Sequence, residues 1–150
     1  MRFLTRDAAK RIGTPDGRID WSLRLAAYEE HLDRLVDRIP LRAMDLARLH
    51  LHDARIVGMK RSRHEVSMAL DTIACAMDPV AATLHFLDVK ERWVPATVVG
   101  SVWLYEEIDI SPLGDFRLDV LLDKDEIMVA ATDVRIELAY GSLGGDAPGV

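Results

Sequence analysis

Three side chains that can bind a metal ion lie within one short segment: His50, His52 and Asp53. In an extended segment, residues two apart point the same way, so both imidazoles could reach one ion with the aspartate beside them. Three such ligands and a water would form a hydrolytic metal site. The same residues also suit a helix-to-strand junction, in which Asp53 accepts from backbone N–H groups. Because the longer His/Asp signatures of metal enzymes are missing, we favour the junction and assign no metal ligand. A metal-dependent hydrolase is the alternative.

Glu106 is the second candidate. In a segment where apolar and polar residues alternate, it occupies a position on the side expected to face the core. The apolar residues of the same phase are Val102, Leu104, Ile108 and Ile110. A buried carboxylate needs a partner, and its pKa is perturbed, as is common at functional sites. Three interpretations stay open: a small-ligand cavity between helices and sheet, a strand that ends or bulges at Tyr105, and an ion pair with an arginine of the helices.

The other face of this segment combines aromatic rings with carboxylates. Its residues are Trp103, Tyr105, Glu107 and Asp109. If exposed, they would bind a basic protein partner, with the aromatic rings as anchors. If the helices cover this face, Trp103 and Tyr105 are core residues instead, since alternation does not say which face is covered. We assign the four residues to partner binding. A further aromatic residue, Trp93, is expected to plug a loop against the sheet.

Helices are predicted for the first third of the chain. A short helix is expected over residues 5–12 with Thr5 as its N-cap. A long helix is expected from an N-cap at Asp20 as far as Pro40, because apolar residues recur every three or four positions. A third helix is expected over residues 41–49. Together they form a helical part over residues 1–52.

Strands are predicted for the remainder, because the apolar period changes from 3.6 to 2 near residue 53. We expect six or seven strands, mostly antiparallel since the connectors are too short for crossover helices, in a sheet or a partly open barrel. The alternation changes phase around residues 131–133, which predicts a bulge or a break. The sequence therefore predicts one α+β domain over residues 1–140, with helices packed on a β-rich part (53–140), and a flexible tail over residues 141–150.

Composition excludes several classes of function. The 150 residues, 49% hydrophobic and 29% charged, are typical of one globular domain. A net charge of −6 argues against nucleic-acid binding and suits a basic partner. The lone Cys75 and the absence of a signal-peptide or membrane-spanning pattern favour a cytoplasmic protein without membrane contact. No phosphate loop, nucleophile elbow or CxxC motif occurs, so neither a catalytic residue nor a cofactor is assigned.

Four stretches carry a resemblance to a known family. They are MRFLTR (residues 1–6), LHDARI (51–56), the predicted strand at 84–89, and VWLYEEI (102–108). They resemble the bacterial family called domain of unknown function 4085. Similar helix-then-sheet layouts occur among small bacterial proteins suspected of neutralising toxins as immunity factors. The resemblance supplies no catalytic residues, and it implies that His52 and Asp53 form a fold-nucleating turn. The leading interpretation is a non-enzymatic protein-binding module, immunity-like or antitoxin-like, whose oligomeric state the sequence leaves open.

Overall fold

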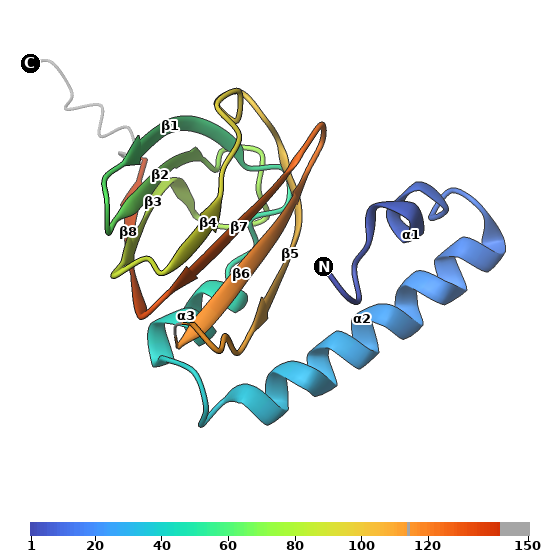
Figure 1. Cartoon of the computed structure of the whole chain (residues 1–150). Coiled ribbons are helices and arrows are strands. Elements are labelled where there is room, and N and C mark those ends of the chain that lie inside the picture. The colour runs from blue at the N-terminus through green and yellow to red at the C-terminus, as the bar shows by residue number, and fades with distance from the viewer. Residues whose placement is uncertain (114, 142–150) are drawn as a thin grey trace, which may run out of the picture.

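The computed structural model describes residues 1–113 and 115–141, and in that part of the chain three helices precede eight strands (Figure 1). The helices are α1 (Arg6–Lys10), α2 (Pro15–Leu35) and α3 (Leu41–Ala47). The strands are β1 (Arg55–Arg61), β2 (Val66–Asp71), β3 (Pro79–Leu87), β4 (Glu91–Trp93), β5 (Trp103–Asp109), β6 (Phe116–Leu122), β7 (Glu126–Ala131) and β8 (Asp133–Tyr140). The predicted α+β class is confirmed, with slightly more strands than expected. Apart from Gly141, the predicted flexible tail lies outside the described residues.

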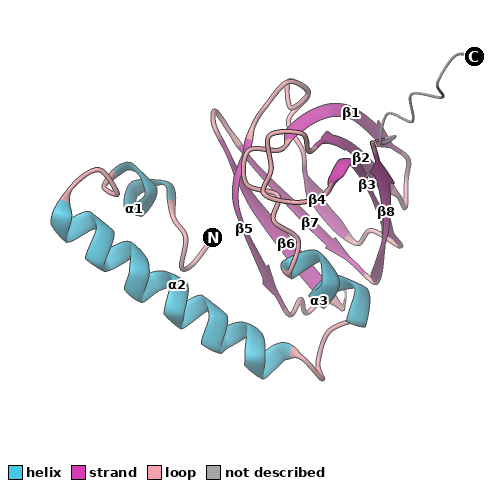
Figure 2. Cartoon of the chain, turned by 180° about the vertical axis from the view of Figure 1, so that it is seen from behind, coloured by secondary structure: helices cyan, strands magenta, loops and turns pink. Residues whose placement is uncertain are grey.

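The strands form two four-stranded antiparallel sheets that pack face to face (Figure 2). The strand order is β1-β2-β3-β8 in one sheet and β4-β7-β6-β5 in the other, so neither the single sheet nor the partly open barrel of the prediction describes it fully. The main core lies between the sheets because one residue in two along each long strand points inward. Among the inward residues, the rings of Phe86 and Phe116 lie 6.4 Å apart, one from each sheet.

The chain crosses from one sheet to the other at two neighbouring points. One crossing joins β3 to β4 and the other joins β7 to β8. The two lie side by side, since Thr132 N–H donates to the Leu87 carbonyl and the Thr132 hydroxyl donates to Asp88 at 2.7 Å. The predicted break around residues 131–133 is therefore confirmed as a change of sheet.

The long helix begins earlier than predicted. Thr14 is its N-cap and accepts from Gly17 N–H at 3.0 Å, and Pro15 occupies the first helical turn. The prediction of Asp20 as the N-cap is wrong, because threonine followed by proline is itself a favourable helix start. Asp20 instead pairs with two arginines. The helix also ends at Leu35, before Pro40, whereas Thr5 caps α1 as predicted.

The helices cover the β5 side of the second sheet (Figure 1). A smaller core joins α1, α2 and the N-terminal segment to this strand, and it includes Leu4, Ala8, Trp21 and Tyr28. The Tyr28 hydroxyl accepts from Ile108 N–H at 2.8 Å. The third helix lies against β8 and β5. In the described part of the chain, no helix combines the length and the apolar character needed to cross a membrane.

Candidate functional site

A bulge in β5 determines where the predicted site residues lie. Trp103 pairs with Leu122 and Tyr105 pairs with Leu121 on β6, so Leu104 is an extra residue between them. An extra residue shifts the alternation by one position. Trp103 therefore points to the same side of the sheet as Glu106 and Ile108, and Tyr105 points to the other side.

The predicted partner-binding face is therefore divided. Trp103 lies in the core between the sheets with 0% exposure, so its assignment to an exposed face is wrong. Tyr105 and Glu107 face the helices, and Glu107 is also buried, at 5% exposure. Asp109 keeps contact with solvent. The other interpretation was that the helices cover this face. It holds for Tyr105, because its ring lies 4.5 Å from that of Trp21 on α2.

Glu107 holds the N-terminal segment against β5. One carboxylate oxygen accepts from the backbone N–H groups of Arg2 and Phe3, each at 2.9 Å. The other accepts from Leu4 N–H at 3.1 Å, and again from Arg2 N–H at 3.0 Å. Charge-assisted bonds of this kind are about twice as strong as neutral ones. The segment is thereby fixed as one wall of a cleft on the outer face of the sheet.

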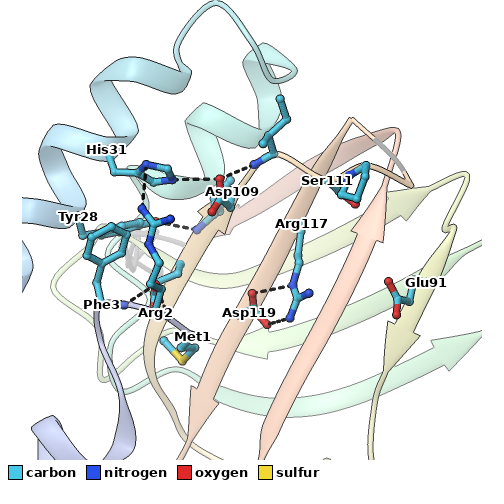
Figure 3. A pocket seen from close by; sticks show the side chains of 14 residues that line it. Met1, Arg2, Phe3, Tyr28, His31, Glu91, Asp109, Ser111, Arg117 and Asp119 are labelled. Atoms are coloured by element: carbon cyan, nitrogen blue, oxygen red, sulfur yellow. Dashed lines mark hydrogen bonds and ion pairs between the residues drawn. The ribbon is translucent and has the colours of Figure 1, made fainter.

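That cleft has a volume of about 370 Å³ and lies between the N-terminal segment, α2 and the outer surface of β5 and β6 (Figure 3). We call it the charged cleft. Its titratable side chains come from five separate parts of the chain and are Arg2, Tyr28, His31, Glu91, Glu107, Asp109, Arg117 and Asp119.

Two networks organise these charges (Figure 3). On the helical wall, Arg2 lies 3.4 Å from Nδ1 of His31, and Nε2 of His31 lies 3.0 Å from the Asp109 carboxylate. These contacts fit the tautomer in which Nε2–H donates to Asp109. On the sheet wall, Arg117 donates two bonds of 2.9 Å to Asp119. This pairing raises the pKa of the Arg117 guanidinium, which stays charged but has its charge matched locally.

An exposed tryptophan lies beside the cleft. Trp93 pairs with Met128 on β7, and Met128 pairs with Asp119 on β6, so the three side chains lie in one row on the outer face of the sheet. Trp93 is 66% exposed, so the expectation that it plugs a loop is wrong. Glu91 belongs to the same short strand and is exposed as well. We call Glu91, Trp93, Arg117, Asp119 and Met128 the open face.

The residues of the metal alternative do not assemble into a site. His52 Nδ1 donates to the Leu104 carbonyl at 2.6 Å, and its Nε2 lies 3.6 Å from Asp53. Asp53 has a left-handed backbone, φ +74°, and its N–H donates to the Trp103 carbonyl. The segment is therefore a turn, as expected for the junction, but among the described residues no backbone N–H donates to the Asp53 carboxylate. Within residues 1–113 and 115–141, no three His, Cys, Asp or Glu side chains are placed to share a metal ion.

Glu106 occupies the core side of β5, as its phase predicts. The residue is half-buried, and one carboxylate oxygen accepts from Trp103 Nε1 at 2.8 Å. Burial raises the pKa of Glu106 to about 7, although the bond from Trp103 favours the charged form. Its partner is thus the indole of the same strand. Among the described residues, no arginine forms an ion pair with it.

The fold and the cleft define a class of α+β protein in which helices and an N-terminal segment cover part of one of two packed antiparallel sheets. The chain belongs to the family described as "Protein of unknown function (DUF4085)", whose model matches residues 16–131. The resemblance found in the sequence is thereby confirmed. The matched range includes the whole open face, but not Arg2. No curated protein and no solved structure matches the chain.

Sequence reasoning missed the open face. Three consecutive exposed residues in β4 have no hydrophobic period, so nothing in residues 91–93 separates a short edge strand from a loop. The available signal was the alternation of β6 and β7, which puts Asp119 and Met128 opposite the core residues. The pairing of β4 with β7 could not be inferred from that pattern.

Proposed function

We propose that the protein is a non-enzymatic binding module for a basic protein partner, and that the open face and the charged cleft are its docking surface. The observation that carries this proposal is the exposure of Trp93, 66%, next to the acidic Glu91 and Asp119. Tryptophan is enriched among the residues that dominate binding energy at protein interfaces. A large ring exposed on a strand loses little conformational entropy when a partner covers it.

The charges of this surface suit a basic partner. The chain has a net charge of −6, and Asp119 matches the charge of Arg117, the one cation of the open face. Glu91 is exposed and adds a further negative charge. A lysine or arginine of the partner could therefore direct its cationic end to Glu91 while its aliphatic stem packs on Trp93 and Met128.

The shape of the surface supports the same role. Three hydrogen-bonded strands, β4, β7 and β6, hold the row of Trp93, Met128 and Asp119, so the side chains are presented on a fixed backbone. The charged cleft beside the row can receive a protruding side chain. An immunity-like or antitoxin-like role is one form of this proposal, in which the basic partner is a toxin domain.

Affinity capture from an extract of the source organism tests the proposal. The wild-type chain should recover a basic protein in stoichiometric amount, and W93A should weaken its binding by about 30-fold or more, as expected for a residue worth 2 kcal/mol. E91R should weaken it as well by placing a cation opposite the partner. The matched control is I73A, because Ile73 is 75% exposed but follows β2 in the other sheet.

Two results would contradict the proposal. One is a stoichiometric partner that W93A and E91R bind as tightly as the wild type does. The other is the failure of the wild-type chain to capture any stoichiometric partner across low and high salt.

A further inference from the structure

A second cavity, of about 290 Å³, lies between α2, the segment that follows α3, and β5. We call it the Glu106 cavity. Tyr28 contributes to the walls of both this cavity and the charged cleft. The other walls are largely apolar and aromatic, and they include Leu25, Leu32, Leu49, Leu104 and Tyr105. Concave sites that combine an apolar lining with convergent polar groups are typical of small-ligand binding.

Glu106 is the acidic residue that β5 contributes to the lining of this cavity, and Glu29 is the one from α2. One oxygen of the Glu106 carboxyl group accepts from the Trp103 indole, which fixes its orientation. None of the ion pairs formed by the described residues involves Glu106. A half-buried carboxylate outside any ion pair is an unusual arrangement, because burying a charge is costly unless it is paired. The charge of His52 nearby favours the ionised carboxylate but does not outweigh the effect of burial.

The aromatic part of the cavity lining is rigid. The Tyr105 ring lies between two other rings, at 4.5 Å from Trp21 and 5.0 Å from His52. His52 is in turn held by its bond to the Leu104 carbonyl. These contacts fix the aromatic surface before any ligand enters, and preorganisation of this kind lowers the entropic cost of binding.

We propose that the Glu106 cavity binds a small organic amine, with the ammonium group against the Glu106 carboxylate and the apolar part against the tyrosine and leucine side chains. An ammonium ion supplies the missing counter-ion and is attracted by the faces of tyrosine rings. A carboxylate ligand would bring two like charges together, and a neutral ligand would leave the glutamate unpaired. The volume is sufficient for a molecule of the size of phenethylamine.

Binding should be coupled to the release of a proton from the protein. Because burial raises the pKa of Glu106 to about 7, the carboxyl group is about half protonated at pH 7. An ammonium ion stabilises the charged carboxylate, so the proton passes to the buffer as the amine binds. The other titratable groups that face the cavity are Tyr28, Glu29, Arg48, His50, His52 and Tyr105.

Isothermal titration calorimetry with phenethylamine, 2-phenylethanol and phenylacetate tests the proposal. At pH 8 the amine should bind more tightly than its neutral and anionic analogues. Its affinity should fall on the order of 100-fold at pH 5, two units below the pKa of the carboxyl group. At pH 7, the measured heat should depend on the ionisation enthalpy of the buffer.

Single-residue variants test whether Glu106 is responsible for the amine binding and its pH dependence. E106Q should lose at least tenfold in amine affinity together with the buffer dependence, because the amide keeps the bond from Trp103 but carries no charge. The control E65Q, at an exposed turn beside β2, should bind as the wild type does. H50A, which removes one histidine from the cavity lining, should retain most of the pH dependence, because the glutamate is its source.

The proposal is overturned if phenethylamine gives no binding at millimolar concentration at pH 8, or if the alcohol binds equally well. It is also overturned if a folded E106Q, checked by circular dichroism, binds the amine like the wild type. If E106Q does not fold, the comparison of amine with alcohol and the pH series on the wild-type chain decide the question. Neither measurement involves the open face, so failure here is separate from failure of the protein-binding proposal.

Discussion

Protonation of the Glu106 carboxyl group makes the stability of the fold depend on pH. The pKa of this group is about 7 in the folded chain, against an ordinary value of 4.5, because burial disfavours the charged form. The folded state therefore binds more protons than the unfolded state between these values. The stabilisation from this group is fully present below pH 4.5 and is lost as the pH rises through 7.

E106Q should consequently be more stable than the wild type at pH 8, by about 1–3 kcal/mol for a half-buried group. At pH 4 the two proteins should have nearly equal stability, because Glu106 is protonated in both states. Urea unfolding of both proteins at pH 4 and pH 8 measures the difference, with E65Q as the control. A wild type that gains stability relative to E106Q as the pH rises would contradict this assignment of the pKa.

For single residues, the sequence pattern predicted the face of Glu106 correctly and that of Trp103 incorrectly. The phase of Glu106 with Ile108 predicted its inward position correctly. Trp103 was assigned to the opposite face because the segment was read as one continuous alternation. Residues 102–105 are all apolar or aromatic, so either register suits them, and nothing in their types reveals Leu104 as the extra residue of a bulge.

Among the elements, the connection between α1 and α2 depends on a glycine inside a helix. A Cβ atom added at Gly17 would lie 1.6 Å from the carbonyl oxygen of Arg11, which is backbone and cannot move alone. G17A should therefore destabilise the protein by about 2 kcal/mol or more, as overpacking does. G13A is the matched control, because a Cβ atom at Gly13 meets nothing within 4 Å.

Thermal unfolding of the two variants measures this difference. G17A should clearly lose stability, whereas G13A should change it by no more than about 0.5 kcal/mol. Equal stability of G17A and the wild type would mean that the two helices do not approach each other at this point.

The strands were predicted well where period 2 continued for five or more residues, and poorly elsewhere. The change of phase near residue 132 correctly marked an irregularity, and the structure identifies it as a change of sheet. The sequence also has a weak internal similarity, in which an Asp-Val step comes late in each of two paired segments. Asp88 and Asp133, the acidic residues of these steps, both lie at the crossings between sheets. Which strands pair across these crossings depends on contacts distant in sequence, and period alone does not specify them.

For the whole molecule, the proposed function depends on which part of the outer face of one sheet is covered and which part is exposed. The N-terminal segment and helices cover β5, whereas the outer side of β4, β7 and β6 keeps an exposed tryptophan and its acidic neighbours. The predicted acidic and aromatic binding surface is thus proposed again, but with Trp93, Glu91 and Asp119 in place of the divided β5 face. Composition suggested an acidic and aromatic surface, whereas the position proposed for it depends on strand pairing between residues distant in sequence.

Site-directed photo-crosslinking of the full chain measures the position of the docking surface most directly. A photoreactive amino acid at position 93 should form a covalent adduct with the captured basic partner, whereas the same amino acid at position 73, exposed on the other sheet, should not. High salt should reduce the adduct, because Glu91 and the net charge of −6 contribute to the attraction. Adducts formed from position 73 but not from position 93 would contradict the account.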